Sequence, residues 1–542
     1  MPDYDILIRG GTIYDGGGGA PFRADVAIHG GQIAAVGDLK DASAEQIINA
    51  DGLAVAPGFI NMLSWSTESL IEDGRSQSEI RQGVTLEIMG EGSSMGPLTE
   101  EMKDTSPGGF MRQGDIRYDI EWTTLGEYLD YLERRGVAPN IASFVGYGTL
   151  RVYAVGYDDR RPTPAEREQM KTLLRQAMEE GAVGLSTALI YPPEFYSTTE
   201  ELVELARVVA EYDGLYISHL RSEGSAFLEA LDEFFTIVRQ AGVRGEIYHL
   251  KAAGRSNWHK METAIARIEA ARAEGLPVTA DMYPYPFSGT GLDASLPPWA
   301  HEGGHNALVE RLKNPETRAR IRAEIVQPAD QWENMYAENW ADRIMVAGFK
   351  TERLKPLTGK TLAEVAAERG TSPEDTLMDL IVEDNSRVFT MYFSMSEDNL
   401  RRQAALPWVS FCSDAGSQAP EGVFLKSNPH PRAYGSFARV LAKYVRDERL
   451  IPLEEAVRRL TSFPAANLKI EGRGWLRPGY AADVAIFDPD KVQDHATPQQ
   501  PHRYSTGMVY VLVNGVPVLY DGEHTGATPG RVVRGPGWKR NA

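Results

Sequence analysis

Three apolar, strand-like runs of the chain end on side chains that can bind a metal or work beside one. Residues 216–219 end on His219, residues 247–249 end on His249, and residues 409–414 end on Asp414. Imidazoles held at strand ends can coordinate zinc, while a separate carboxylate can move protons at a reacting group. Because the catalytic groups of a (β/α)₈ barrel lie at the C-terminal ends of its strands, this pattern predicts a metal-dependent hydrolase on such a barrel.

The central part of the chain has the pattern of alternating strands and helices that such a barrel needs. Short apolar runs are followed by amphipathic stretches, for example residues 165–180 and 199–212. Candidate strands start near Phe59, Val84, Ile141, Val183, Leu215, Ile247, Val278, Val388 and Val409. This is one strand more than a barrel holds, so we expect a charged, helix-rich insertion at about residues 289–376, over one end of the barrel, that has recruited the strand at Val388.

The two ends of the chain have a different pattern, typical of half-buried strands. Residues 5–9, 25–28 and 32–36 alternate between apolar and polar, and a similar alternation returns at 483–487 and 509–519. We therefore expect an α/β protein with two parts. The parts are a barrel domain at residues 58–469 and a small β-sandwich domain built from residues 1–57 and 470–542.

Composition limits the partners. A hydrophobic content of 42% and a charged content of 24% are typical of a soluble globular protein. The net charge of -20 argues against nucleic acid and against acidic membranes, both of which need a basic surface. Residues 1–5 lack the basic start of a signal peptide, and no apolar run approaches the ~18 residues of a membrane span. We expect a cytoplasmic protein, and the single cysteine, Cys412, excludes an internal disulfide.

A series of short motifs is spread over nearly the whole chain. The motifs are Ala-Pro-Gly-Phe-Ile at 56–60, Gln-Gly-Val-Thr at 82–85, Gly-Tyr-Gly-Thr-Leu-Arg at 146–151, Gly-Leu-Ser-Thr at 184–187, Tyr-Pro-Pro at 191–193, Ser-His-Leu-Arg at 218–221, His-Leu-Lys at 249–251, Asp-Met-Tyr-Pro-Tyr at 281–285, Ser-Asp at 413–414 and His-Pro-Arg at 430–432. In this order they resemble the N-acyl-D-amino-acid deacylases, or D-aminoacylases, of the amidohydrolase superfamily. Each motif alone is weak evidence, but their ordered succession is specific.

The resemblance implies roles for individual residues. His219 and His249 match the two histidines that hold the tightly bound zinc of that family, and Asp414 matches its general base and acid. The resemblance also implies that the carboxylate of the amino-acid part of the substrate is bound at Tyr283, Ser288 and Arg432. Arginine suits that role because its guanidinium can bind a carboxylate through two parallel hydrogen bonds.

The chain departs from the family pattern at two places. Leu63 and Trp65 replace a His-x-His pair that holds a second metal, and Glu91 stands where the family has a cysteine ligand. Two imidazoles and a glutamate are a known catalytic zinc set, so we expect Glu91 to be the third ligand of a single Zn²⁺ per chain. The alternative is a carboxylate that only caps the glycine-rich turn at 90–94. We expect Leu63 and Trp65 to form an apolar wall that shapes the acyl pocket.

Three further residues have open interpretations. Tyr191 and Lys251 are candidates for contact with the substrate. Lys251 could instead pair with Glu91 or Asp414 and orient it, or be an ordinary solvated lysine. Cys412, on a buried strand, fits a core thiol better than a ligand or nucleophile.

The leading hypothesis is a zinc-dependent amidohydrolase that cleaves a linear N-acyl bond of a small molecule, most simply an N-acyl-D-amino acid, to a carboxylate and an amine. A second hypothesis keeps the enzyme but changes the substrate to a peptide, a cyclic amide or an amide without an amino-acid carboxylate. A third, suggested by the missing histidines, is a catalytically silent barrel that binds or scaffolds. The sequence leaves a homo-oligomer open.

Overall fold

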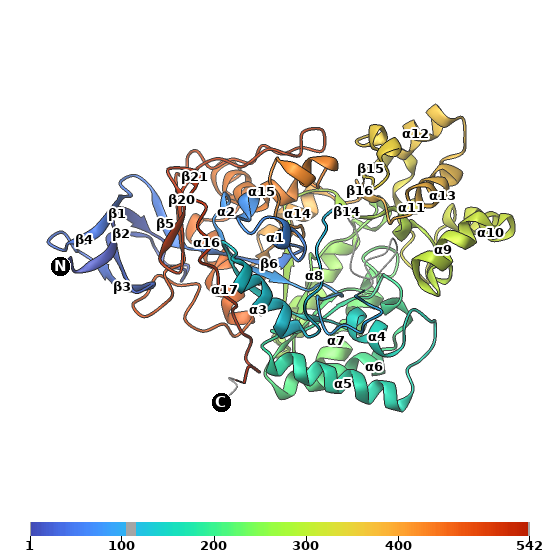
Figure 1. Cartoon of the computed structure of the whole chain (residues 1–542), viewed down its shortest axis with the longest axis horizontal. Coiled ribbons are helices and arrows are strands. Elements are labelled where there is room, and N and C mark those ends of the chain that lie inside the picture. The colour runs from blue at the N-terminus through green and yellow to red at the C-terminus, as the bar shows by residue number, and fades with distance from the viewer. Residues whose placement is uncertain (1, 104–114, 540–542) are drawn as a thin grey trace.

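The structure is a computed structural model that describes residues 2–103 and 115–539 of the chain. A parallel barrel occupies the centre, a β-sheet made from both termini lies at one end, and an inserted lobe lies at the other (Figure 1). Among the described residues, no helix combines the length and the apolar character needed to cross a bilayer.

The barrel has eight strand positions, as predicted. Its strands are β6 (Phe59–Ser64), β7 (Val84–Met89), β8 (Asn140–Ser143), β9 (Val145–Gly146), β10 (Gly184–Ala188), β11 (Leu215–His219), β12 (Arg244–Ile247), β13 (Val278–Met282) and β17 (Val409–Phe411). β8 and β9 are two halves of one strand, because β8 pairs with β7 and β9 pairs with β10, with one residue between them. All these neighbours pair in parallel.

The first and last strands close the barrel beside Asp414. The backbone N–H of Asp414 donates to the carbonyl of Leu63 at 2.9 Å, and that of Trp65 donates to the carbonyl of Ala415 at 3.0 Å. Closure therefore brings residues separated by about 350 positions in the sequence into one rim, and the barrel prediction is confirmed.

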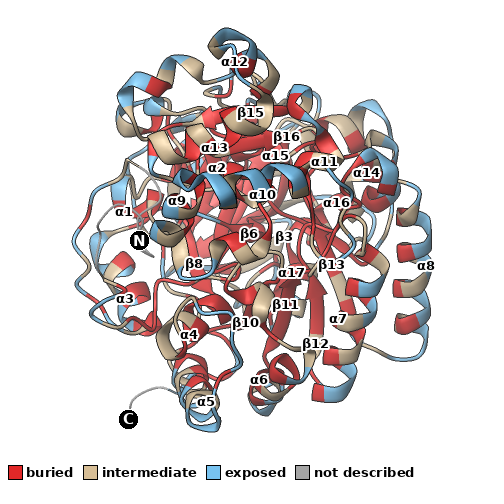
Figure 2. Cartoon of the chain, turned by 90° about the vertical axis from the view of Figure 1, so that its right-hand side faces the viewer, coloured by how far each residue is buried: buried red, intermediate tan, exposed pale blue. Residues whose placement is uncertain are grey.

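Helices cover the outside of the barrel and turn their buried faces toward it (Figure 2). They are α1 (Ser69–Glu72), α2 (Gln77–Ile80), α3 (Leu125–Arg135), α4 (Tyr147–Ala154), α5 (Pro164–Glu179), α6 (Thr199–Glu211), α7 (Phe227–Ala241), α8 (Lys260–Ala273), α14 (Glu397–Ala404), α15 (Arg432–Arg439), α16 (Leu453–Leu460) and α17 (Ser462–Asn467). Local sequence defines the start of α5, where the Thr163 side chain accepts from the backbone N–H of Glu166 and the Glu166 carboxylate accepts from that of Thr163. The helices predicted at 165–180 and 199–212 are thus confirmed.

The insertion is longer than predicted. Its sheet has the order β14 (Ser288–Gly291), β16 (Phe389–Tyr392), β15 (Ile344–Gly348), all antiparallel, and its helices are α9 (Gly304–Lys313), α10 (Pro315–Ile325), α11 (Met335–Asn339), α12 (Leu362–Arg369) and α13 (Pro373–Asp384). The predicted limit at residue 376 falls inside α13, because the strand that follows Val388 pairs with β14 rather than with the barrel. This lobe has an apolar core of its own.

Strands from both termini form one sheet of nine strands, at the left of Figure 1. They are β1 (Tyr4–Ile13), β2 (Phe22–His29), β3 (Gln32–Gly37), β4 (Ala44–Asn49), β5 (Ala54–Pro57), β18 (Val484–Phe487), β19 (Met508–Val513), β20 (Val516–Tyr520) and β21 (Glu523–His524). The antiparallel pairing of β5 with β18 joins the two chain ends. The domain limits at residues 57 and 470 stay a prediction.

The barrel interior carries two neighbouring acidic residues below the strand ends. Glu246 on β12 is fully buried and accepts hydrogen bonds from Thr279 Oγ1 at 2.8 Å and Asn467 Nδ2 at 3.0 Å. Burial, assisted by the charge of Asp281 on β13, raises the pKa of Glu246 to about 8. Asp281 in turn accepts the backbone N–H of His249 at 2.6 Å, which ties this layer to the strand end above it.

The raised pKa of Glu246 predicts that stability falls with rising pH. The folded protein keeps a proton up to a pH of about 8 that the unfolded chain releases near 4.5, so the contribution is complete below about 4.5 and is lost as the pH rises through about 8. We expect the melting temperature of Glu246→Gln, followed by calorimetry, to decline less between pH 5 and 9 than that of the wild type. Glu269→Gln, at an exposed position on α8, should follow the wild type. Equal declines in all three proteins would contradict the prediction.

Candidate metal centre

Three buried side chains from three barrel strands converge on one point. Glu91, His219 and His249 are each at most 5% exposed, and one potential ligand atom from each lies within 4.8 Å of the other two. Glu91 Oε1 lies 3.1 Å from His219 Nδ1 and 2.8 Å from His249 Nε2. Ligand atoms around a tetrahedral zinc are separated by roughly 3.3 Å, so the cluster fits one such ion with little movement.

The backbone directs these groups inward at the strand ends. His219 is the last residue of β11, and His249 follows β12 by two residues with a positive φ of 33°. Asp414 also has a positive φ, 49°, just after β17. Positive φ is costly for residues with a Cβ and is typical of functional sites. Gly90, with φ of 100°, precedes Glu91, and a side chain there would overlap the Phe144 carbonyl.

The electrostatics of the cluster suit a cation. Burial opposes ionisation of Glu91, but the charges of His249 and His219 outweigh it and lower the pKa of Glu91 below its ordinary range. Burial lowers the pKa of His219, which favours the neutral imidazole that a metal requires. Burial and Lys251 also oppose protonation of His249, yet Glu223 and Glu91 raise its pKa to about 10 without a metal. A bound cation would take the place of that proton.

A second buried carboxylate, Glu223, lies on the other side of the two imidazoles. Its oxygens lie 3.1 Å from His249 Nδ1 and 3.3 Å from His219 Nε2. A carboxylate behind a ligating histidine fixes the ring and strengthens the ligand. Sequence reasoning missed Glu223; the available signal was its place four residues after His219, within the same strand-end loop.

Lys251 has a different partner from those expected. Its Nζ donates to both oxygens of Glu223, at 2.8 and 2.9 Å, and lies 2.7 Å from His249 Nδ1. The side chain is 4% exposed, so it is not a solvated lysine. Pairing with Glu91 or Asp414 was wrong because Glu91 turns toward the two imidazoles, and Glu223 fills the space on the lysine side.

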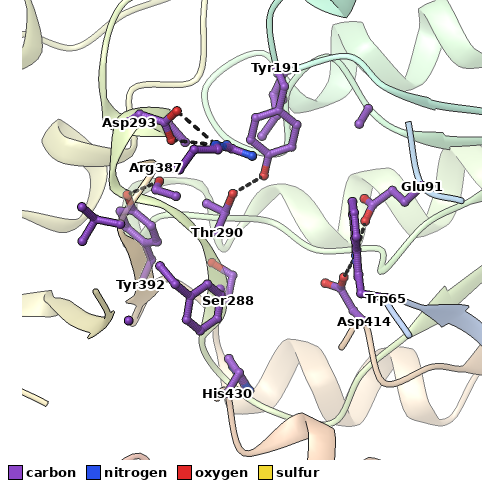
Figure 3. A pocket seen from close by; sticks show the side chains of 18 of the residues that line it. Trp65, Glu91, Tyr191, Ser288, Thr290, Asp293, Arg387, Tyr392, Asp414 and His430 are labelled. Atoms are coloured by element: carbon purple, nitrogen blue, oxygen red, sulfur yellow. Dashed lines mark hydrogen bonds and ion pairs between the residues drawn. The ribbon is translucent and has the colours of Figure 1, made fainter. Parts of the chain in front are cut away.

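Asp414 is held by two donors, of which Figure 3 shows Trp65. The indole Nε1 of Trp65 donates to Asp414 Oδ1 at 3.2 Å and to Glu91 Oε2 at 3.0 Å. Arg432 Nη1 forms an ion pair with Asp414 Oδ2 at 2.6 Å. Burial is the main cause that raises the pKa of Asp414 above its ordinary value, while Arg432 lowers it and Glu91 raises it. Asp414 is therefore a carboxylate whose affinity for a proton is increased, next to the metal cluster.

The predicted apolar wall of Leu63 and Trp65 is corrected. Leu63 is fully buried in the barrel core and is not among the described residues that line the cavity. Trp65 does line the cavity, but its indole N–H is a donor that two carboxylates accept. Residue type alone suggested an apolar pair, since neither acceptor of that N–H is near Trp65 in the sequence.

A cavity of about 610 Å³ opens over the cluster, between the barrel rim and the inserted lobe. Predicted substrate-contact residues that line it are Tyr191, Lys251, Tyr283, Ser288 and Arg432. The Tyr283 ring packs 4.5 Å from the guanidinium carbon of Arg432, and Ser288 is the first residue of β14. Cys412 is a free, buried thiol outside this lining, as expected of a core residue.

Comparisons with known proteins agree with this geometry. The chain matches the model of the amidohydrolase family over residues 46–519. It is 34% identical to a D-aminoacylase of Alcaligenes xylosoxydans xylosoxydans, over 98% of this chain and 97% of the relative. It also superposes on an N-acyl-D-glutamate deacylase of Bordetella bronchiseptica, solved with zinc and a phosphonate that mimics the tetrahedral intermediate. That match has a TM-score of 0.81 and 32% identity, and it covers 98% of this chain and 99% of the other.

A further similar structure is a D-aminoacylase with a binuclear metal centre, for which activation by one metal and attenuation by a second are described. The TM-score is 0.81 at 32% identity, covering 98% of this chain and 100% of that one.

The geometry predicts that Glu223 supports metal binding without being a ligand. We expect Glu223→Gln to weaken zinc affinity by about 10- to 100-fold, because the imidazoles lose their orienting carboxylate. Glu91→Ala should weaken it further, since a ligand is removed. Competition with a chelator, followed by metal analysis, measures both, with Glu269→Gln as the surface control. Unchanged affinity in Glu223→Gln would show that the carboxylate does not act on the ligands.

Proposed function

The chain belongs to the amidohydrolase family, and we propose that it is a zinc-dependent deacylase that hydrolyses the linear N-acyl bond of an N-acyl-D-amino acid. The observation that carries the proposal is the placement of Glu91, His219 and His249 beside Asp414 and Arg432 in one cavity. The activities of the similar D-aminoacylase and N-acyl-D-glutamate deacylase support the substrate class.

The donor set suits zinc, because two imidazole nitrogens and one carboxylate oxygen leave a fourth tetrahedral position open. When bound, the metal would supply a Lewis acid that polarises the scissile carbonyl and lowers the pKa of water. Glu91, His219 and His249 would hold it, and Glu223 would keep both rings in place. The buried surroundings limit competition from bulk water.

Asp414 would carry the proton. Its carboxylate would accept a proton from the attacking water and deliver it to the departing nitrogen, so that one group serves as base and then as acid. Trp65 and Arg432 leave it only a small range of orientations, because each donor holds one oxygen. Both donors also stabilise the ionised form that must accept the proton.

Arg432 is the best candidate for binding the carboxylate of the substrate. The residue is 4% exposed, and its Nε and Nη1 form no hydrogen bond with any described residue, although Nη1 lies in the ion pair with Asp414. Buried donors of this kind are costly unless an acceptor arrives. Tyr283 supports the guanidinium from one face, and Ser288 contributes a hydroxyl at the cavity wall.

We also propose one metal per chain. A second cation would have to lie between Glu91 and Asp414, where the indole N–H of Trp65 now donates to both carboxylates. Indole nitrogen is a donor only and cannot ligate a metal. Trp65, at a position where the family resemblance implies a histidine ligand, thus fills this space with an indole N–H instead.

Replacement of Asp414 tests the mechanism. Asp414→Asn should lower kcat by about 10²- to 10⁴-fold on N-acyl-D-amino acids while retaining zinc, because the amide cannot accept the proton. Steady-state kinetics and metal analysis on the same preparation measure this, with the exposed Asp159→Asn as control.

A zinc-loaded wild type that hydrolyses none of a panel of N-acyl-D- and N-acyl-L-amino acids would contradict the function itself. Turnover of amides without a carboxylate, unaffected by Arg432→Gln, would favour the alternative substrate class. Binding without any hydrolysis would favour the silent scaffold.

Substitution of Trp65 tests the metal count. In excess zinc we expect one metal per chain in the wild type and in Trp65→Phe, which loses the N–H without gaining a ligand. Trp65→His should bind a second metal, because an imidazole then joins Glu91 and Asp414. Equilibrium dialysis with metal analysis gives the stoichiometry independently of activity. Two metals in the wild type would refute the one-metal proposal.

A further inference from the structure

We propose that the cavity contains a second anion-binding subsite formed by Arg387, and that the preferred substrates carry a second carboxylate besides the one bound at Arg432. This inference rests on the proposed deacylase function and deepens it by naming the substrate class. The class is N-acyl amino acids with two carboxylates, the second lying either on the amino-acid side chain or at the end of the acyl group.

Arg387 reaches the cavity from the inserted lobe, at the start of the segment that leads into β16 (Figure 3). Its Nε lies 3.1 Å from Asp293 Oδ1 and 3.0 Å from Oδ2, so one edge of the guanidinium is anchored. Its Nη1 and Nη2 form no hydrogen bond with any residue that the structure describes, and the side chain is 36% exposed. An anchored arginine with two free parallel donors is the arrangement that binds a carboxylate in two contacts.

Tyr191 places this subsite next to the metal cluster. The guanidinium carbon of Arg387 lies 5.2 Å from the centre of the Tyr191 ring, and the centre of that ring lies 5.5 Å from the centre of the His219 imidazole. The Tyr191 hydroxyl donates to Thr290 Oγ1 at 2.8 Å, which fixes the ring. A single aromatic ring therefore separates Arg387 from a metal ligand, a span that suits one small dicarboxylic substrate.

The backbone of the lobe is shaped around the Arg387–Asp293 pair. At Gly291 a side chain would overlap Asp293 Oδ1 and lie 3.0 Å from Arg387 Nε. The backbone N–H of Leu292 donates to the carbonyls of Arg387 and Val388, both at 2.8 Å. The pairing of β14 with β16 thus fixes both partners, and the same strand β14 carries Ser288, the candidate for the first carboxylate.

Charge leaves few other candidates for an anion. The arginines and lysines among the described cavity-lining residues are Arg387, Arg432, Lys251 and Lys350. Arg432 faces Asp414, and Lys251 is held by both oxygens of Glu223. An anion on the lobe side of the cavity therefore meets Arg387 and Lys350, and of these two only the guanidinium of Arg387 offers two parallel donors to a carboxylate.

Matched substrates that differ only in charge test the subsite. In the wild type, kcat/KM should be about 10- to 100-fold higher for N-acetyl-D-glutamate than for N-acetyl-D-glutamine, or higher by the same factor for N-succinyl-D-leucine than for N-acetyl-D-leucine. The first result places the second carboxylate on the side chain, and the second places it on the acyl group. Arg387→Gln should abolish the preference, mainly through KM, whereas Arg387→Lys, which keeps the charge without the paired donors, should retain part of it.

Arg353→Gln, an exposed arginine of the same lobe, is the control and should keep the wild-type ratio. Binding of N-acetyl-D-glutamate to the Asp414→Asn variant, with and without Arg387→Gln, supplies an equilibrium constant that does not depend on turnover.

Hydrolysis without preference for a second carboxylate, or an equal loss on charged and neutral substrates in Arg387→Gln, would overturn the subsite and leave the deacylase function standing. Failure of the wild type to hydrolyse any N-acyl amino acid would overturn both.

Discussion

The site depends on one buried contact set, in which Glu91 Oε1 lies between His219 and His249. A carboxylate away from water is stable in its ionised form only beside positive charge or a metal. Glu223 encloses the same two rings from behind and is itself held by Lys251. The two carboxylates, Glu91 and Glu223, carry more negative charge than Lys251 can balance. A cation or protons on the imidazoles must supply the remaining positive charge.

Trp65 links this cluster to Asp414, because its indole N–H donates to carboxylates on both sides. Its N–H accommodates two carboxylates that would otherwise repel each other, since Glu91 raises the pKa of Asp414. In the related D-aminoacylase a second metal attenuates the activity obtained with one. Here the neutral indole N–H of Trp65 lies between the two carboxylates, and we propose that Asp414 stays available as a proton acceptor.

The inserted lobe and the barrel both contribute residues to the cavity. We propose that the barrel supplies the metal ligands and the proton carrier. In the lobe, Ser288 lies on β14, Asp293 lies in the 3-10 helix Leu292–Ser295 that follows it, and Arg387 lies just before β16. A lobe with its own apolar core can vary at these positions without disturbing the barrel strands. In this proposal the lobe adds substrate contacts to those of Arg432 and Tyr283, which belong to the barrel domain, and the two sets meet at one cavity.

The sequence alone determined the barrel, its strand ends and the core of the site, because period, apolar runs and residue chemistry are local properties. His219, His249 and Asp414 each stand at the end of a recognisable strand, so their convergence follows from the geometry of a parallel barrel. Family resemblance added Glu91, Tyr283, Ser288 and Arg432, and the roles of all these site residues in this chain remain predictions.

Only the tertiary structure decided which groups are partners. Glu223 pairs with Lys251 from another strand-end loop, and the Trp65 indole donates to Glu91 after β7 and to Asp414 after β17. Arg387 pairs with Asp293, 94 residues away in the sequence, because β14 and β16 lie side by side. The sequence already attached the strand near Val388 to the insertion, but only the folded chain shows that this strand, β16, pairs with β14 and so extends the lobe beyond residue 376. Hydrogen bonds and ion pairs form between neighbours in space, and the folded chain alone defines those neighbours.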